Sequence, residues 1–557
     1  MIVKSSCYGK LFCFLCLQFL SIILVYSPPS WSPVYTVRGI LTIPYAELQE
    51  PLYAWYDSKN GKSRIDYYGG MDKTYQLTAS VYGPYGTSLK IAPVTTEKVL
   101  NQQTCLQVNG TQEQQVSTQT VLPDMTDFKF METMQDSETS KWQMVQTIGD
   151  KVNKYTMWVK YKKTLRGDNS IPIPVRYEMK GFNSLLGSHY DHYYIDYTDY
   201  DVEDIDPSVF KIDPSMHCAS FPGPGQRHYA TFNPMAEFVH PIRDEHVNDE
   251  FDRFKRKHGK TYASDVEHEK RINLFRQNLR FVQSSNRGRR GFSLAVNQLA
   301  DRTDSELAAL RGRRYSGPNP LGLPFPYSDS AIEAESAKLP PEHDWRLFGA
   351  VTPVKDQSVC GSCWSFGTAG AVEGALFLHN GGHLVRLSQQ ALVDCSWGYG
   401  NNGCDGGEDF RAYQWIMKHG LPTEDEYGGY LGQDGYCHID NVTTVAGMKG
   451  WVNVTTNNEN ALKLAIFKNG PISVAIDASH KSFSFYSKGV YFEPKCKNKI
   501  DELDHAVLAV GYGVLNGARY WLVKNSWSNL WGNDGYVLMA SRDNNCGVQT
   551  APTYVVM

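Results

Sequence analysis

The first half of the chain alternates apolar and polar residues with a period of two. From about residue 31 to 235, runs such as Lys154 to Tyr161 and Asp191 to Tyr197 repeat tyrosine and β-branched residues in this way. Turn signals at residues 59–62 and 166–169 separate the runs. Such alternation is typical of strands with one buried face. It predicts a helix-poor antiparallel β domain over residues 28–240, ending near the Pro/Gly stretch at residues 221–225.

Between about residues 241 and 310 the period becomes that of a helix. One stripe at helical spacing consists of Glu267, Arg271, Phe275, Asn278, Val282 and Asn286. After it, Ala295, Asn297, Leu299 and Asp301 stand at alternate positions. Residues 311–338, which include Arg313, Arg314, Gly317, Pro318 and Pro320, predict an exposed, protease-sensitive linker. A final unit then spans residues 339–557.

The N-terminus predicts entry into the secretory pathway. Lys4 and Lys10 precede an apolar run from Leu11 to Tyr26, which is shorter than the roughly 20 residues of a membrane-spanning helix. We therefore predict a cleaved signal peptide at residues 1–27, with an uncut signal anchor as the alternative. No comparable run follows, so we predict no membrane span, and a lysosome, granule or extracellular destination.

Composition narrows the classes of partner. The 557 residues are 41% hydrophobic and 20% charged, with a net charge of −4, which describes ordinary globular protein of two or three folded units. Because there is no basic excess, nucleic acid is not expected as a partner. We predict no cofactor and no metal site.

The cysteine count points to one odd thiol. Of twelve cysteines, Cys7, Cys13 and Cys16 would leave with the signal peptide. Cys105 and Cys218 remain in the first half, where one bridge would stabilise the β domain by several kcal/mol. Seven remain in the last third, which makes three pairs and a thiol. Such a thiol either bridges to another chain or is reactive, and spacing alone does not decide between them.

The surroundings of Cys363 favour the reactive alternative. It precedes an alanine- and glycine-containing stretch, residues 367–378, that predicts a helix, and a helix N-terminus favours the thiolate form. His505 opens an apolar run that reads as a buried strand, and Asn525 ends a second one. A cysteine nucleophile needs an imidazole and a third group that orients it. Singly, such a histidine or asparagine is usually structural, but the three together predict a catalytic set.

The segment from Cys360 to Trp364, with the distant His505 and Asn525, resembles the papain family of cysteine peptidases, in its cathepsin L-like branch. The helical stripe and the motif around Asn297 and Asp301 resemble the family's I29-type inhibitor propeptide, at residues 241–310. In that motif Ala295 and Leu299 replace the usual glycine and phenylalanine. The resemblance implies an α+β fold, in which a papain-like domain with a helical lobe and a β-barrel-like lobe follows the propeptide and the β domain.

The resemblance also implies roles for individual residues. Cys363 is the expected nucleophile, His505 the general base and then acid, and Asn525 the residue that orients the imidazole. Gln357 would donate to the oxyanion hole beside the backbone N–H of Cys363. Trp527 would shield the hydrogen bond between His505 and Asn525 from water. For Trp527, and for Trp531 below, plain packing in the core is the alternative. The expected substrate-binding residues are Gly406 and Gly407 for the peptide backbone, Trp531 on the leaving-group side, and Asp409, Ala475, Leu503, Ala506 and Ala551 in the pocket for the second residue before the cut.

Three disulfides of the last third follow from the same resemblance, namely Cys360–Cys404, Cys395–Cys437 and Cys496–Cys546, and they leave Cys363 free. Most residues of the expected pocket are small or apolar, which favours an apolar substrate side chain, whereas Asp409 would admit a basic one. Sequons for N-glycosylation stand at Asn109, Asn441 and Asn453.

The β domain is not part of an ordinary family member. The whole arrangement resembles that of two-chain insect haemocyte proteinases, whose precursor is cut between an N-terminal piece and the enzyme. Residues 177–210 resemble the curved half-barrels of lipoprotein carriers, which implies either a hollow sheet for an apolar ligand or a sheet that packs on another domain.

Three hypotheses follow. The first is an endopeptidase acting on peptides and proteins, made as a zymogen whose helical propeptide lies in the cleft and leaves at acidic pH, with the β domain retained as a second chain. The second is an exopeptidase in which the β domain blocks one end of the cleft. The third is an inactive protease fold used for binding, against which the complete set of Gln357, Cys363, His505 and Asn525 argues.

Overall fold

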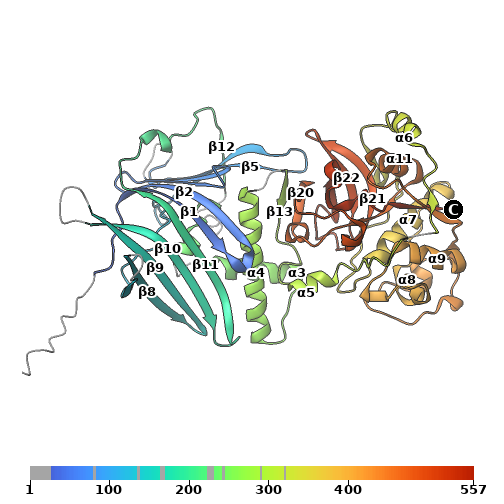
Figure 1. The fold of residues 1–557 in the computed structure, drawn as a ribbon, viewed down its shortest axis with the longest axis horizontal. Coiled ribbons are helices and arrows are strands. Elements are labelled where there is room, and N and C mark those ends of the chain that lie inside the picture. Colours follow the sequence, from blue (N-terminus) through green and yellow to red (C-terminus); the bar gives the residue numbers. More distant parts are fainter. Residues whose placement is uncertain are drawn as a thin grey trace, which may run out of the picture.

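The computed structural model describes residues 27–78, 83–134, 138–163, 170–221, 231–240, 245–288, 291–318 and 321–557. The predicted signal peptide, except for Ser27, lies outside these ranges, as do the turn signal at 166–169 and most of the Pro/Gly stretch. Figure 1 shows the light-green helices around α4 between the N-terminal sheet and the C-terminal unit. Within the described ranges, no helix has the length and apolarity needed to cross a membrane.

Twelve strands form one sheet in the N-terminal unit, in the order β12-β6-β5-β4-β3-β2-β1-β11-β10-β9-β8-β7. Neighbours pair antiparallel except for β12, which runs parallel to β6 and is linked to it by the Cys105–Cys218 disulfide. The sheet is open and twisted, with no closed barrel among the described residues (Figure 1). Its strands are β1 (Val34–Ile43), β2 (Leu48–Asp57), β3 (Lys62–Tyr67), β4 (Asp72–Leu77), β5 (Thr87–Val94), β6 (Gln102–Asn109), β7 (Lys129–Met134), β8 (Thr139–Ile148), β9 (Lys151–Lys163), β10 (Ser170–Asn183), β11 (Ser188–Asp201) and β12 (Cys218–Ser220).

One face of this sheet is covered by the chain itself. The alternation in β9 buries Tyr155 and Met157 on that face. Residues of the segment 116–128 and of the short helix α2 (Ala236–Val239) belong to the same hydrophobic cluster. The hydroxyl of Tyr193 donates to a carbonyl of α2 at 2.9 Å. Of the two roles that the half-barrel resemblance implied, packing against other parts of the chain is therefore the one that the described residues support.

The helical unit consists of α3 (Glu245–His258), α4 (Asp265–Gly288) and α5 (Asp304–Ala309), with the short strand β13 (Phe292–Leu294) between α4 and α5. The predicted stripe lies on α4. Its asparagines bind the chain that follows: Asn278 donates to the Ala300 carbonyl, and Asn286 exchanges two hydrogen bonds with Leu294, each at 2.8 Å. These bonds turn the chain after α4 towards the C-terminal unit, where β13 pairs with β20.

The opposite side of α4 contacts the N-terminal sheet through buried ion pairs. Arg287 binds Glu50 of β2 through two bonds of 2.9 and 2.8 Å. Arg280 binds Asp191 at 2.7 Å and Glu237 at 2.6 Å. Every one of these side chains is less than 10% exposed. Helix α4 is thus enclosed between two units instead of facing solvent.

The C-terminal unit has a helical lobe and a sheet lobe. The helices are α7 (Cys363–His379), α8 (Gln389–Cys395), α9 (Asp409–His419), α10 (Glu424–Tyr427), α11 (Glu459–Asn469) and α12 (Lys481–Ser484). The sheet has the order β13-β20-β23-β22-β21-β19-β24-β18-β14, with β15 (His343–Asp344) beside β21. Its strands include β14 (Leu323–Pro324), β18 (Gly450–Asn453), β19 (Ile472–Ile476), β20 (Tyr486–Tyr491), β21 (His505–Leu515), β22 (Ala518–Lys524), β23 (Tyr536–Ala540) and β24 (Thr553–Val556).

The linker differs from its prediction at its start. Gly312 and Arg313 are buried, whereas the residues after Arg313 are mostly exposed as far as the helix α6 (Asp329–Ser336). Arginine and glycine composition predicted exposure, but the neighbouring surface of the C-terminal unit supplies acidic and backbone partners for these residues. The exposed part of the linker is therefore shorter than residues 311–338.

Candidate active site

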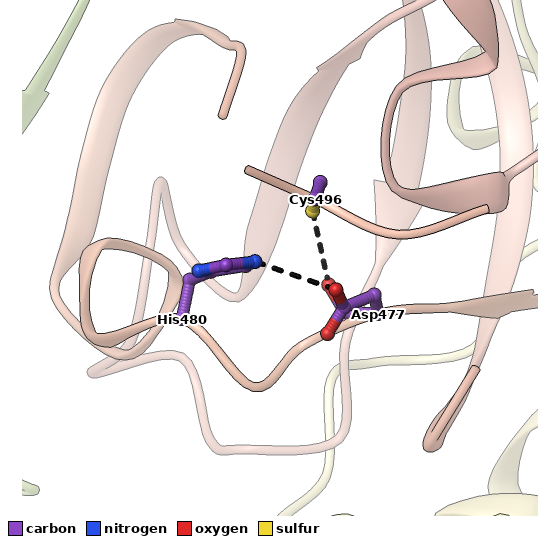
Figure 2. A group of neighbouring side chains, drawn as sticks. All are labelled: Asp477, His480 and Cys496. Atoms are coloured by element: carbon purple, nitrogen blue, oxygen red, sulfur yellow. Dashed lines mark hydrogen bonds and ion pairs between the residues drawn. The ribbon is translucent and has the colours of Figure 1, made fainter. Parts of the chain in front are cut away.

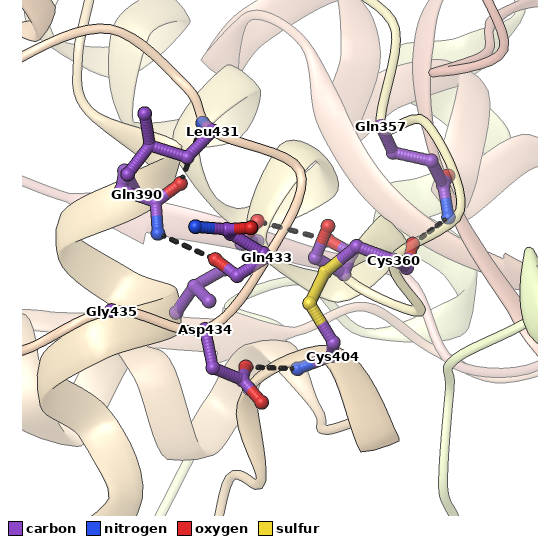
Figure 3. Close-up of a disulfide and its surroundings, with 12 residues drawn as sticks. Gln357, Cys360, Gln390, Cys404, Leu431, Gln433, Asp434 and Gly435 are labelled. Atoms are coloured by element: carbon purple, nitrogen blue, oxygen red, sulfur yellow. Dashed lines mark hydrogen bonds between the residues drawn. A yellow bond between two sulfur atoms is a disulfide. The ribbon is translucent and has the colours of Figure 1, made fainter.

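Cys363 is the first residue of α7, as the sequence predicted, and it is the free cysteine of the described chain. The preceding loop is fixed by the Cys360–Cys404 disulfide (Figure 3). Around that disulfide, the Gln357 side chain donates to the Cys360 carbonyl at 2.8 Å, and Cys404 N–H donates to Asp434 at 2.7 Å. These bonds place the thiol at the amino end of the central helix with little freedom to move.

His505 and Asn525 lie next to each other on adjacent strands. His505 opens β21 and Asn525 directly follows β22. Nε2 of His505 lies 2.8 Å from Oδ1 of Asn525, and Ser526 N–H donates to the same oxygen at 2.8 Å. Because an amide oxygen only accepts, Nε2 carries the proton and Nδ1 is left as the basic nitrogen. The Trp527 ring lies 4.8 Å from the imidazole and covers this pair.

Burial sets the protonation of the thiol and the imidazole. Both residues are 0% exposed. Burial raises the pKa of the Cys363 thiol, in spite of backbone hydrogen bonds that act in the opposite direction. Burial likewise lowers the pKa of His505 to about 4, which outweighs its bond to Asn525. In this covered state both groups are neutral near pH 7, so the nucleophile is not ionised.

The predicted oxyanion donor is occupied by the chain before the linker. The side-chain amide of Gln357 donates to the Leu310 carbonyl at 2.8 Å. Its own oxygen accepts from the hydroxyl of Ser526 at 2.6 Å, which fixes which end of the amide points into the cleft. A carbonyl oxygen thus already sits where an oxyanion would be stabilised.

An extended segment, residues 310–314, fills the cleft beside Cys363. Gly312 N–H donates to the Cys363 sulfur at 3.3 Å, and the Gly312 carbonyl accepts from Gly407 N–H at 2.9 Å. Arg314 N–H donates to the Gly407 carbonyl at 3.2 Å. The sequence placed the helical part of the propeptide in the cleft. The structure instead places this extended segment there, because an extended backbone can bond to Gly407 whereas a helix uses its own groups internally.

Gly312 is the residue that allows this close approach. A Cβ atom there would stand 1.7 Å from the Gly361 carbonyl oxygen and 2.3 Å from its carbon. The obstacle is backbone beside the nucleophile, so it does not move aside as a flexible side chain does.

The residues expected in the substrate pocket are mostly brought together. Asp409, Ala475, Ala506 and Ala551 line one cavity of about 300 Å³. Leu503 does not line it, although its carbonyl accepts from Arg313 at 2.8 Å. Trp531 is fully buried and packs on Phe483 and Trp527.

Glu408 also lines this cavity and was missed from the sequence. It directly follows Gly407, and a charged residue next to a glycine that is expected to bind the substrate is the signal that could have revealed it.

The eight remaining cysteines of the described chain form Cys105–Cys218, Cys360–Cys404, Cys395–Cys437 and Cys496–Cys546. These are the pairs that the cysteine count and the family resemblance implied. One apparent metal-ligand cluster, drawn in Figure 2, consists of Asp477, His480 and Cys496. The Cys496 sulfur is bonded to Cys546, so it has no thiolate to offer, and the His480 to Asp477 contact of 3.3 Å is an ion pair.

A thiol at a helix N-terminus, a histidine oriented by an asparagine, and a cleft filled by the chain's own upstream segment together define the latent form of a cysteine protease. Comparison with known proteins agrees with this class. Residues 339–556 match the papain family cysteine protease model, and residues 251–307 match the cathepsin propeptide inhibitor domain (I29).

Relatives and solved structures each match a little more than half of the chain. Digestive cysteine proteinase 1 of Homarus americanus is 45% identical over 315 residues, which are 55% of this chain and 94% of that protein. The cathepsin L-like peptidase of Aedes aegypti is 45% identical over 318 residues, 55% of this chain and 93% of that protein. The structure of digestive procathepsin L 3 from Tenebrio molitor larval midgut has a TM-score of 0.50 at 37% identity and covers 56% of this chain and 99% of that chain. This chain belongs to the papain family of cysteine proteases, and it is a cathepsin L-like member made with its propeptide.

Proposed function

We propose that this chain is the precursor of an endopeptidase in which Cys363 is the nucleophile, His505 the base and acid, Asn525 the orienting residue and Gln357 an oxyanion donor. The observation that carries the proposal is the 2.8 Å bond between His505 and Asn525 beside a free cysteine at the start of α7. Such an arrangement leaves Nδ1 of His505 free to exchange a proton with the thiol.

In the proposed mechanism, His505 takes the thiol proton and the Cys363 sulfur attacks the carbonyl carbon of the substrate. A C–S bond forms, and the carbonyl oxygen becomes an oxyanion that the Gln357 amide and the Cys363 N–H stabilise. When the C–N bond breaks, His505 gives its proton to the leaving amine. Water then attacks the acyl carbon while His505 takes its proton, the C–S bond breaks to release the carboxylic acid, and His505 returns the proton to the Cys363 sulfur.

Gly406, Gly407, Asp409, Ala475, Ala506 and Ala551 are proposed to bind the substrate, with Leu503 contributing its carbonyl and Trp531 supporting the leaving-group side. Support comes from the propeptide segment, which already bonds to both backbone groups of Gly407. An extended substrate offers the same groups, so removal of residues 310–314 would open the cleft to it.

We further propose that cleavage in the exposed linker leaves the β domain and the propeptide attached as a second chain. The buried pairs Arg287–Glu50 and Arg280–Asp191 hold α4 to the sheet, and the pairing of β13 with β20 holds the propeptide to the enzyme outside the cleft, so both can persist when residues 310–314 leave it. Direct contacts of the sheet with the enzyme are lighter, such as Leu100 N–H to Asn516 at 2.9 Å. The β domain would therefore stay bound through the propeptide.

This arrangement favours the endopeptidase over the exopeptidase. In Figure 1, α4 and β13 lie between the sheet and the C-terminal unit, whereas α7 lies on the far side. The described contacts of the β domain reach Asn516, after β21, and no described residue of it contacts Cys363. Release of residues 310–314 from the cleft would therefore uncover Cys363 while the β domain stays attached.

We propose that the protein passes through the secretory pathway, and that its location is a lysosome, a granule or the extracellular space. The disulfides of the described chain fit an oxidising compartment. Asn109 and Asn441 are exposed and suit glycosylation. Asn453 is half-buried, and its side chain lies where a Cβ on Gly322 would stand 2.3 Å away, so it is the sequon least suited to carry a glycan.

Blocked internal peptides test the function. Acid-incubated precursor should cleave a peptide that is acetylated at its N-terminus and amidated at its C-terminus, and Cys363→Ala should reduce the rate by a factor on the order of 10⁶. Cleavage of free-ended peptides alone would favour the exopeptidase. An intact fold with no cleavage of either would support the binding protein instead.

A further inference from the structure

The propeptide places a positive charge in the pocket beside the cleft. The Arg313 side chain is buried, and its Nη1 donates to the carbonyls of Ile500 and Leu503 at 2.9 and 2.8 Å. Its Nη2 lies 3.4 Å from Glu408, and in this ion pair the two side chains are 8% and 3% exposed. The guanidinium is thus fully engaged by the pocket wall.

Arg313 stands at a position that a substrate residue would take. The hydrogen bonds to Gly407 are made by its two neighbours, the Gly312 carbonyl and the Arg314 N–H, while its own N–H donates to the Asp504 carbonyl, one residue before His505, at 3.0 Å. Held in this way, Arg313 lines the pocket together with Glu408 and Asp409. The propeptide therefore reveals which side chain this pocket accepts.

The floor of the pocket holds a second carboxylate. Oδ2 of Asp409 accepts hydrogen bonds from the hydroxyls of Ser473 and Thr553, at 2.9 and 2.8 Å. Both hydroxyls donate to Asp409 and carry no charge, so they fix the carboxylate in place without neutralising it. Three further lining residues, Ala475, Ala506 and Ala551, are small, and the cavity has a volume of about 300 Å³. A long side chain fits there.

Departure of Arg313 and Ser316 from the cleft leaves this pocket with excess negative charge. Glu408 then loses Arg313 and also the two bonds that it accepts from Ser316 of the linker. The positive group that stays near it is Arg411, at 3.8 Å, and Arg411 also donates to the Tyr399 carbonyl at 2.9 Å. The carboxylates of Glu408 and Asp409 then line the cavity, and an apolar side chain of the substrate offers them neither a positive charge nor a hydrogen-bond donor.

We propose that the mature enzyme prefers a basic residue, arginine or lysine, as the second residue before the cleaved bond, bound by Glu408 at the wall and Asp409 at the floor. This inference rests on the proposed endopeptidase function and names its substrate class. An arginine in the substrate restores the contacts that Arg313 makes, namely the carboxylate of Glu408 and the carbonyls of Ile500 and Leu503. A leucine in that place restores none of them and leaves the acids unpaired.

Two blocked fluorogenic peptides that differ in this residue test the preference. The full-length precursor is first processed and then assayed. Its kcat/KM for the Arg-Arg coumarin amide should exceed that for the Leu-Arg amide by at least about 10-fold, the factor that corresponds to about 1.4 kcal/mol. Both peptides carry the same residue at the cut, so the ratio isolates the pocket.

Variants assign the preference to the two acids. Glu408→Gln and Asp409→Asn should each lower the ratio of kcat/KM for the Arg-Arg amide to kcat/KM for the Leu-Arg amide. In the double variant this ratio should fall by about 10-fold. Glu426→Gln changes an exposed acid on α10 away from the pocket, and it should leave the ratio and both rates as they were. The kcat/KM ratio is measured for each single variant, so the test stays valid if one of the two variants folds poorly.

A preference for Leu-Arg that neither variant alters would overturn the inference while leaving the endopeptidase intact. An Arg-Arg preference that survives both substitutions would also overturn it, because the selectivity would then come from elsewhere. Hydrolysis of neither peptide would contradict the proposed function itself.

Discussion

The propeptide is bound at two surfaces that are built in different ways. On the side of the β domain, α4 buries charged side chains, with Arg287 on Glu50 and Arg280 on Asp191 and Glu237. On the side of the enzyme, residues 310–314 bind inside the cleft, through backbone groups at Gly407 and at the Cys363 sulfur and through the ion pairs Arg313–Glu408 and Arg311–Asp504.

This difference separates a permanent contact from an exchangeable one. Any extended peptide offers the backbone groups that the cleft uses, so a substrate can replace the propeptide there. The buried pairs of α4 are made with the N-terminal unit and not with the cleft, and removal of one member leaves an unpaired charge in the interior. The β domain thus binds the propeptide through contacts of α4 for which substrates do not compete.

The largest expected effect comes from breaking one buried pair. Glu50→Gln leaves Arg287 without its partner, and such a loss costs roughly 3–5 kcal/mol. Amide hydrogen exchange in α4 should then become roughly 100- to 1000-fold faster. Glu132→Gln is the matched control, because Glu132 pairs with Lys141 on the same sheet with 59% of its side chain exposed. Unchanged protection of α4 in Glu50→Gln would refute the comparison.

A smaller effect is expected at the cleft. Gly312→Ala places a methyl group against the Gly361 backbone, and overpacking of this kind costs about 1–3 kcal/mol. Alkylation of Cys363 in the intact precursor should become roughly 10- to 100-fold faster, while α4 stays protected. Gly447→Ala, where a Cβ meets no atom within 4 Å, should change nothing. Loss of protection in α4 as well would mean that the two surfaces are not independent.

As the pH falls, the contacts of the propeptide helices should weaken at a higher pH than the contacts of residues 310–314 in the cleft. The bond to Arg271 lowers the pKa of Glu306 to about 2 from its ordinary 4.5. At Glu237, burial acts to raise the pKa, but Arg280 and His246 outweigh it and hold the pKa well below its usual range. Carboxylates with lowered pKa values stabilise the fold above about pH 4.5, and this contribution is lost as the pH falls towards 2.

In the cleft, burial raises the pKa of both Glu408 and Asp504. These groups bind protons more readily in the folded chain than in the unfolded one, so acid does not weaken the fold through them. Hydrogen exchange followed from neutral pH down to about pH 3, corrected for intrinsic rates, should show α4 opening at higher pH than residues 310–314. The reverse order would contradict the assignment of the acid-sensitive side.

The smallest effect is expected where the β domain meets the enzyme directly. Lys481 and Glu47 lie 3.9 Å apart, with Glu47 71% exposed. Glu47→Gln should change the dissociation of the β domain from the cleaved enzyme by less than about 0.5 kcal/mol, as measured by concentration-dependent size-exclusion chromatography. Dissociation that becomes 10-fold easier would show that this contact matters more than the propeptide.

Much of the candidate site could be predicted from sequence because the chemistry restricts residue types. A thiol near a predicted helix start, and a histidine and an asparagine at the ends of apolar runs, can be recognised in the sequence; in the structure the histidine and the asparagine are hydrogen-bonded and the thiol begins α7. The alternation of the first half likewise predicted a sheet with one buried face.

The two propeptide surfaces were not visible in that way. Glu50 and Arg287 lie far apart in the chain, and no periodicity or motif connects them. Arg313 looked like part of an exposed linker, since its burial depends on Glu408 and two carbonyls that the fold brings to it. The tertiary structure decides which charged residues pair over long range, and local secondary-structure propensity does not predict these pairs.

The central claim is that Cys363 is a nucleophile that the propeptide keeps covered, and thiol labelling tests it most directly. The full precursor is treated with an epoxysuccinyl inhibitor at neutral pH and again after acid incubation, and the labelled residue is mapped by mass spectrometry. Cys363 should react at least roughly 100-fold faster after processing, because burial keeps the thiol neutral and inaccessible beforehand. Equal labelling before and after processing, or an intact processed fold in which Cys363 stays unlabelled, would contradict the account.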